Sequence, residues 1–180
     1  MVIAIGSGDA FHLGVLSSHI HCEWTLRAGG WLGMGNDNRY NKSLVFDPFP
    51  FPDATQAQRT AIADLAEELD ATRKTALAEV PGLTMTEIYN LRERQRTGEL
   101  TDLLQIERAA QARAGIIDRL HEQIDAKVAA AYGWPADLPL AEIVARLVAL
   151  NATRAAEEKA GIIRWLRPDY QRPRFGAGQV

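Results

Sequence analysis

The sequence predicts a mainly helical α+β chain, in which a small mixed segment of strands and helix is followed by a helical C-terminal domain. Two observations support this class. After residue 53 the chain is rich in Ala, Leu, Glu, Arg and Gln, which are strong helix formers. Just before it, prolines at alternate positions within 47–53 require an extended backbone and exclude a helix. We therefore expect two domains, residues 1–53 and residues 54–180.

The first domain is predicted to contain two strands and one long helix. The apolar run 2–5 predicts a short strand, and Asp9 is a suitable N-cap for a helix that continues to about Ala28. Residues 32–38 are rich in glycine and asparagine and indicate a loop or hairpin end, and residues 43–46 predict a second strand. One apolar stripe along the helix is expected to face the core: Phe11, Val15, His19 or Ile20, and Trp24.

Helical periodicity predicts most of the second domain. The expected helices cover 55–79, 85–97, 101–132 and 140–159, and 162–166 is expected to be a short strand or turn. Thr84 and Glu87 have the spacing of a capping box. The expected core positions are Ile62, Leu65, Leu69, Leu103, Ile106, Ala110, Ile117, Leu120, Ile124, Val128, Leu140, Ile143, Leu147 and Leu150.

Composition excludes several classes of protein. The net charge of −3 is not that of a general nucleic-acid coat. No apolar run approaches the ~18 residues of a membrane span, and the start lacks the basic region of a signal peptide. The single cysteine, Cys22, excludes an internal disulfide framework and a cysteine-based zinc site. We expect a cytoplasmic protein.

The motifs typical of enzymes are incomplete. The glycine turn at residues 6–8 lacks the third glycine of a dinucleotide fingerprint, because Phe11 stands in its place. His19 and His21 point about 200° apart on a helix and cannot share an ion. We therefore expect no catalytic, cofactor-binding or metal-binding residue in this chain.

A polar loop is the strongest candidate for a binding site. Arg and Asn side chains can form paired hydrogen bonds with purine edges, and Lys can contact a phosphate. The alternative is a polar hairpin whose asparagines only shape the turns. The candidate residues are Asn36, Asp37, Asn38, Arg39, Tyr40, Asn41 and Lys42.

An ordered series of short blocks resembles one family, the MmeI-type enzymes. These enzymes fuse a restriction nuclease, an adenine-N6 DNA methyltransferase and a target-recognition domain. The first blocks resemble the end of the target-recognition domain: Phe11 to His21, Gly29-Gly30, Arg39-Tyr40-Asn41 and Phe46 to Pro52. The later blocks resemble the C-terminal helical domain: Ala129 to Pro135, Ile143 to Leu147, Leu150-Asn151 and Gly161 to Gln171.

This resemblance implies that the chain is the C-terminal portion of a larger parent. The Asn-Pro-Pro-Tyr catalytic motif, the S-adenosylmethionine site and the nuclease would lie before Met1, so the cofactor and the flipped adenine belong to the parent. The implied partners are double-stranded DNA and the remainder of the methyltransferase polypeptide, with no membrane.

The resemblance also makes the polar loop the DNA-reading candidate. Asp37 would accept from a cytosine amino group, Arg39 would donate to guanine, and an asparagine would pair with adenine. Tyr40 has an alternative role in packing beneath the strand. Candidates for phosphate contacts are Lys42 and the tail arginines Arg164, Arg167, Arg172 and Arg174. The alternative is that these side chains form an ordinary solvated surface.

Two other functions stay open. One is a helical protein–protein interaction module without a nucleic-acid role, which the amphipathic helices and the acidic total charge favour. The other is a small stand-alone enzyme built on the histidine cluster of His12, His19 and His21 with Cys22.

Overall fold

The computed structural model describes residues 5–32 and 37–176, and these are mostly helical, as predicted. Contacts divide the chain into two compact units, each assembled from separated segments. The hairpin unit contains the described residues within 1–8, 21–51 and 137–180. The bundle unit contains residues 9–20 and 52–136.

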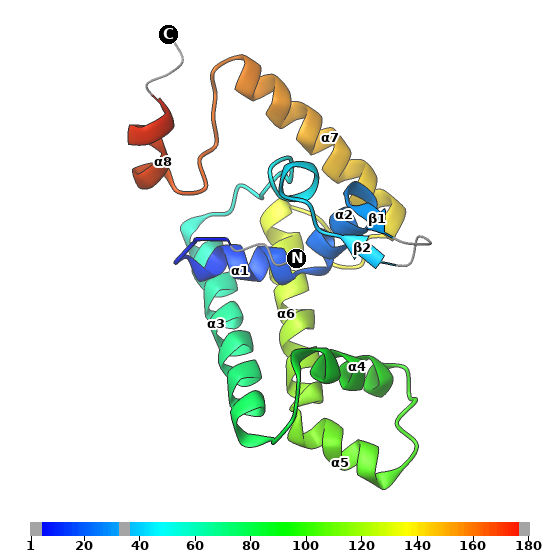
Figure 1. Cartoon of the computed structure of the whole chain (residues 1–180). Helices are drawn as coiled ribbons and strands as arrows, with labels where there is room; N and C mark the ends of the chain where they lie inside the picture. Colours follow the sequence, from blue (N-terminus) through cyan, green and yellow to red (C-terminus); the bar gives the residue numbers. More distant parts are fainter. Residues whose placement is uncertain (1–4, 33–36, 177–180) are drawn as a thin grey trace. The chain divides into compact units, whose positions relative to one another are not determined.

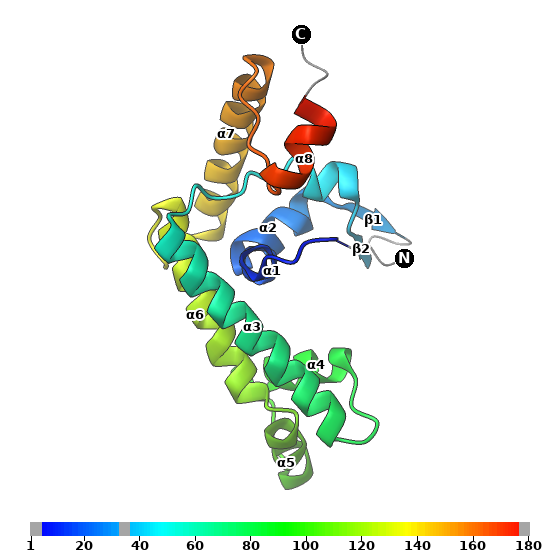
Figure 2. The same ribbon diagram turned by 90° about the vertical axis from the view of Figure 1, so that its left-hand side faces the viewer.

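The bundle unit is built on two long antiparallel helices, α3 (Gln56–Glu79) and α6 (Ala114–Tyr132), which lie side by side in both views (Figures 1 and 2). Its helices are α1 (Ala10–Ser17), α3 (Gln56–Glu79), α4 (Met85–Arg96), α5 (Leu103–Gln111) and α6 (Ala114–Tyr132). α1 packs on both α3 and α6, and α4 and α5 pack near the start of α6. The largest fully buried side chains of this unit are Phe11, Val15, Ile62, Leu69, Ile88, Ile117, Ile124 and Val128.

α1 and α3 approach each other closely at a glycine. Gly14 is buried on α1, and a Cβ atom added there would collide with the side chain of Ile62. The same atom would lie 3.1 Å from the Ile62 carbonyl oxygen and 3.4 Å from Ala66 Cβ. The contact therefore depends on the absence of a side chain at residue 14.

Several helix ends follow the sequence signals. Asp9 caps α1 by accepting from Phe11 N at 2.9 Å, and Thr84 caps α4 by accepting from Glu87 N at 3.2 Å. α6 ends at Tyr132 and is capped by Gly133, which has φ 71° in the left-handed region that glycine tolerates best. The predicted helices over 55–79 and 85–97 are thus confirmed to within about a residue at each end.

The hairpin unit combines a short antiparallel ladder with helices (Figure 1). Its elements are α2 (His19–Ala28, in this unit from residue 21), β1 (Gly30–Leu32), β2 (Asp37–Arg39), the π-helical turn η1 (Lys42–Phe46), α7 (Leu140–Lys159) and α8 (Pro168–Phe175). Gly30 pairs with Arg39 in the ladder, and Leu32 pairs with Asp37.

An aromatic cluster forms the core of the hairpin unit. Trp24 on α2 donates its indole N–H to the Val45 carbonyl oxygen at 2.9 Å. The ring of Phe49 is buried and packs edge-on against His21 and Phe51. The distances between ring centres are 4.4 Å to His21 and 5.1 Å to Phe51. Asn151 on α7 donates to the Pro48 carbonyl oxygen at 2.5 Å. The proline-rich segment is therefore a structural part of this core.

The predicted strand over 43–46 is wrong, because these residues form the helical turn η1. Asn41 begins the turn by accepting hydrogen bonds from Ser43 N at 3.0 Å and from Ser43 Oγ at 2.9 Å. The Val45 side chain is fully buried, and its backbone carbonyl oxygen accepts the hydrogen bond from the Trp24 indole N–H. These contacts outweigh the strand preference of a short apolar run. Among the described residues, strand is limited to β1 and β2, so the mixed strand segment is not formed as expected.

The two longest predicted helices are each interrupted. The expected helix over 9–28 is split at Ser18, which has ψ 154° and donates its hydroxyl to the Val15 carbonyl oxygen at 2.7 Å. The expected helix over 101–132 is split at Arg113, whose φ is 57°. The turn between α5 and α6 leaves Leu103 77% and Ile106 47% exposed, so their assignment to the core is wrong.

The ends of the chain also differ from expectation. The predicted strand over 2–5 lies largely outside the described residues. Residues 162–166 form no strand, and the following helix α8 was not expected. On α7, Ile143 and Leu147 are buried as predicted, whereas Leu140 is exposed. None of the described helices is long and apolar enough to cross a membrane.

Candidate nucleic-acid interface

The predicted DNA-reading residues lie on β2 and on the segment that leads from it into η1. Asp37, Asn38 and Arg39 form β2, and Asn36 lies outside the described residues. Tyr40 and Asn41 connect the strand to Lys42, the first residue of η1. Arg39, at the end of the strand and opposite Gly30, is exposed. The end of β2 therefore presents a charged residue to solvent.

Tyr40 ties this segment to α2. Its hydroxyl lies 3.2 Å from His21 Nε2, within hydrogen-bond distance, and the two rings are 5.8 Å apart. Burial lowers the pKa of His21 to about 4. Burial, followed by the charge of Asp47, raises the pKa of Tyr40 to about 12. Both groups are therefore neutral near pH 7, and their contact links the residue that follows Arg39 to α2.

The next two candidates are held in contacts of the same segment. Asn41 uses its side-chain oxygen to cap η1, as described above. Lys42 Nζ lies 2.8 Å and 2.7 Å from the two carboxylate oxygens of Asp47. Both residues of this ion pair are solvent-exposed, so a phosphate can replace the carboxylate at small cost. Arg39 and Lys42 are therefore two exposed cations, the first in β2 and the second at the start of η1.

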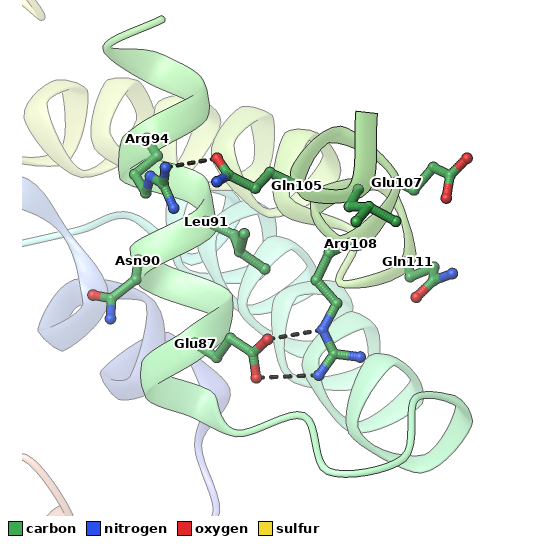
Figure 3. Close-up of a pocket in the computed structure, with 9 residues that line it drawn as sticks. Glu87, Asn90, Leu91, Arg94, Gln105, Glu107, Arg108 and Gln111 are labelled. Atoms are coloured by element: carbon green, nitrogen blue, oxygen red, sulfur yellow. Dashed lines mark hydrogen bonds and ion pairs between the residues drawn. The ribbon is translucent and has the colours of Figure 1, made fainter. Parts of the chain in front are cut away.

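A second candidate for a binding site is an open groove of about 630 Å³ between α4 and α5 (Figure 3). Glu87 on α4 accepts from Arg108 Nε at 2.8 Å and from Nη2 at 3.2 Å. Arg94 donates to Gln105 Oε1 at 2.6 Å. The hydrogen bond from Arg108 holds the pKa of the Glu87 carboxyl below its usual value. Both arginines bridge the two helices, so the groove is best explained as a brace between α4 and α5.

A third cluster joins α3, α4 and α6 inside the bundle unit, and the sequence analysis did not find it. The Tyr89 hydroxyl lies 2.8 Å from Nε2 of the buried His121. Arg73 donates to the same hydroxyl, and Arg92 pairs with Asp118 at 2.7 Å. These residues are too far apart in the sequence to form a local motif. The one local signal was His121, a single histidine within the apolar face of α6.

This cluster predicts a pH dependence of stability. Burial, reinforced by the cations Arg92 and Arg73, lowers the pKa of His121 to about 4. As pH falls from about 6.5 towards 4, His121 becomes protonated in the unfolded chain but stays neutral in the folded chain. The free energy of unfolding therefore falls by about 1–3 kcal/mol. Urea unfolding of His121→Gln at neutral pH and at about pH 4.5 should show a smaller loss than the unchanged chain.

The control for this prediction is His19→Gln, because the His19 side chain is exposed. At neutral pH its free energy of unfolding should be close to that of the unchanged chain. Part of the loss should also persist in His121→Gln, since burial lowers the pKa of His21 as well. Equal losses in all three proteins would contradict the assignment to His121.

The histidine cluster of the sequence consists of His12, His19, His21 and Cys22. Within the described residues, no group of three or more His, Cys, Asp or Glu side chains is placed to hold an ion. His12 and His21 are buried, whereas His19 and Cys22 are exposed. The structure therefore separates side chains that the sequence places close together.

Comparison with known proteins identifies one related fold. No family profile matches the sequence, and no curated protein sequence matches it. Over 83% of the chain, the fold is similar to part of the type IIL restriction-modification enzyme MmeI, whose structure was solved in complex with DNA. The TM-score is 0.61 and the sequence identity is 21%. The chain spans 17% of the length of that MmeI chain, so the likeness confirms a related fold for one part of it.

Proposed function

We propose, from this likeness to a restriction-modification enzyme in complex with DNA, that the chain binds duplex DNA and contributes to target recognition. The observation that carries the proposal is the similarity, over 83% of the chain, to part of an enzyme whose structure was solved in complex with DNA. The chain would act as the C-terminal portion of an adenine-N6 DNA methyltransferase or restriction–modification enzyme. The remainder of that polypeptide would bind S-adenosylmethionine and perform catalysis.

The geometry of the hairpin supports this role. Arg39 is exposed at the end of β2, while Tyr40 beside it is held through His21 on α2. A side chain that reads base edges must be presented from a backbone that does not move, because misplaced donors lose their paired hydrogen bonds. The proposed assignments are Arg39 for guanine, Asp37 for a cytosine amino group, and Asn36, Asn38 or Asn41 for adenine. Lys42 would contact a phosphate.

The proposal predicts the effect of Arg39→Ala on sequence choice. Loss of a paired hydrogen bond to guanine should cost about 1–3 kcal/mol at one base pair and should relax the preference there. The measurement is enrichment of a randomised duplex library by the purified chain, followed by sequencing of the bound fraction. Arg39→Lys should also relax the preference, because an ammonium group cannot form the paired contact.

A matched control is Arg96→Ala, because Arg96 is an exposed arginine of the bundle unit that pairs with Glu93. This variant should enrich the same sequences as the unchanged chain. If Arg39→Ala also enriches them unchanged, Arg39 does not read a base. If the unchanged chain enriches no sequence, the recognition role of the chain is refuted.

A second candidate function is a helical protein-interaction module. The observation that favours it is the apolar surface of α5, where Leu103 is 77% and Leu104 is 79% exposed. Salt distinguishes the two functions. Binding to phosphates weakens steeply as salt rises, whereas apolar docking of helices hardly responds. A protein partner captured equally at low and high salt, without DNA binding, would favour this alternative.

A further inference from the structure

Helix α8 organises the basic tail around one aromatic ring. Arg167 and Arg174 both lie over the ring of Tyr170, with their guanidinium carbons 4.4 Å and 3.9 Å from its centre. Arg174 also donates to the Tyr170 carbonyl oxygen at 3.1 Å. Arg172, in the last turn of the same helix, is exposed, as are Arg167 and Arg174. We call these three arginines with Tyr170 the α8 patch.

The fourth tail arginine has a different environment. Glu157 accepts from Arg164 Nε at 2.7 Å and from Nη2 at 2.9 Å. Arg154 donates to the same carboxylate at 3.0 Å, and these hydrogen bonds lower the pKa of Glu157 to about 2. The charge of Arg164 is therefore compensated within the chain. The α8 patch has three guanidinium groups, and the acidic residue of α8 is Asp169. The patch therefore carries an excess of positive charge.

We propose that the α8 patch contacts the phosphates of duplex DNA, as a second contact surface separate from the hairpin; this inference rests on the proposed function. Guanidinium groups match phosphate oxygens with two parallel hydrogen bonds. Stacking on Tyr170 restricts Arg167 and Arg174 before any ligand binds, which reduces the entropy lost on binding. None of the residues of α8 is buried, and besides stacking on Tyr170 the Arg167 side chain donates to the Gly6 carbonyl oxygen.

The position of the patch favours an extended polyanion over a small phosphate ligand. α8 and the β1–β2 hairpin belong to the same compact unit, and both views show them at separate places in it (Figures 1 and 2). Duplex DNA carries a charge about every 1.7 Å of its axis. One duplex therefore offers neighbouring phosphates to all three arginines of the patch, which a small phosphate ligand does not.

The test is the salt dependence of binding by the full chain. The probe is a duplex of about 25 base pairs taken from the enriched library, with affinity measured by fluorescence anisotropy across a salt series. The double variant Arg172→Gln, Arg174→Gln should bind all duplexes more weakly, without a change in preferred sequence. Loss of two phosphate contacts lowers the slope of log affinity against log salt by about 1.8, since each contact contributes about 0.9. Between 50 and 200 mM salt, the affinity of the unchanged chain should therefore fall about twelvefold more than that of the variant.

Two further variants distinguish the patch from general charge. Arg164→Gln removes one positive charge that Glu157 already compensates, and its slope should equal that of the unchanged chain. Arg172→Lys with Arg174→Lys keeps both charges and should restore most of the slope. Circular dichroism of each variant confirms that helix content is retained, as expected for residues that are not buried.

The outcomes separate this inference from the proposed function. If the unchanged chain binds DNA and the glutamine double variant has the same slope, the α8 patch is overturned and recognition by the hairpin stands. An equal loss of slope in Arg164→Gln would also overturn the patch. If the unchanged chain binds no duplex, both proposals fail. Binding to vesicles of anionic lipid that depends on Arg172 and Arg174, without DNA binding, would assign the patch to a different partner.

Discussion

Replacing Phe49 by alanine is expected to lower the free energy of unfolding of the hairpin unit by about 3–5 kcal/mol. Phe49 is 4% exposed, and its ring contacts His21, Trp24 and Phe51. Its removal leaves a cavity in the small core that carries the hairpin. Urea unfolding followed by circular dichroism measures the loss, and binding of the enriched duplex should weaken with it because Tyr40 loses its support through His21.

The control for Phe49→Ala is Phe175→Ala, since Phe175 is 59% exposed on α8. That variant should change the free energy of unfolding by less than about 0.5 kcal/mol. A loss of similar size in both variants would mean that the aromatic cluster is not the core of this unit.

The second large effect is expected at the crossing of α1 and α3. Gly14→Ala should destabilise the bundle unit by about 1–3 kcal/mol, because the new Cβ collides with Ile62 and presses on its carbonyl group. Backbone atoms of α3 cannot move aside as a side chain can. The free energy of unfolding in urea is again the measurement.

The same substitution at Gly115 on α6 provides a matched control with the opposite sign. A Cβ atom there meets the Nε2 atom of the exposed Gln95 side chain at 3.0 Å, and that side chain can move. Alanine is also favoured over glycine inside a helix by roughly 0.5–1 kcal/mol. Gly115→Ala should therefore leave stability unchanged or raise it. Destabilisation by both substitutions would show that the contact with Ile62 is not what distinguishes residue 14.

The sequence predicted those parts of the fold that local chemistry determines. Helix α3 lies where periodicity predicts it, and α4 lies where periodicity and the cap at Thr84 predict it. The breaks at Ser18 and Arg113 could not be predicted, because the helical pattern continues through both residues. Arg113 adopts its left-handed conformation at the turn that leads from α5 into α6, and no local signal marks that turn. At Ser18 the hydroxyl bonds locally to the Val15 carbonyl oxygen, which a serine can do without marking the break in the apolar pattern.

The candidate site shows the same limit. Composition and resemblance selected residues 36–42 as one polar group, but they do not distinguish the roles within it. Only the structure shows that Asn41 caps η1 and that Lys42 pairs with Asp47, while Arg39 is exposed. The link between Tyr40 and His21 joins two segments that the sequence does not connect. The assignment of these residues to DNA remains a prediction that the variants above can test.

The discontinuous make-up of the hairpin unit has a consequence for protein engineering and for evolution by recombination. The segment 21–51 and the segment 137–180 belong to one unit. The Asn151 side chain of the second segment donates a hydrogen bond to the Pro48 carbonyl oxygen of the first. A crossover placed at residue 53 would transfer the hairpin without α7, the helix that carries this bond. Grafting of the hairpin into a homologous scaffold therefore requires both segments to come from the same donor, or a recipient whose α7 already carries an asparagine at the matching position.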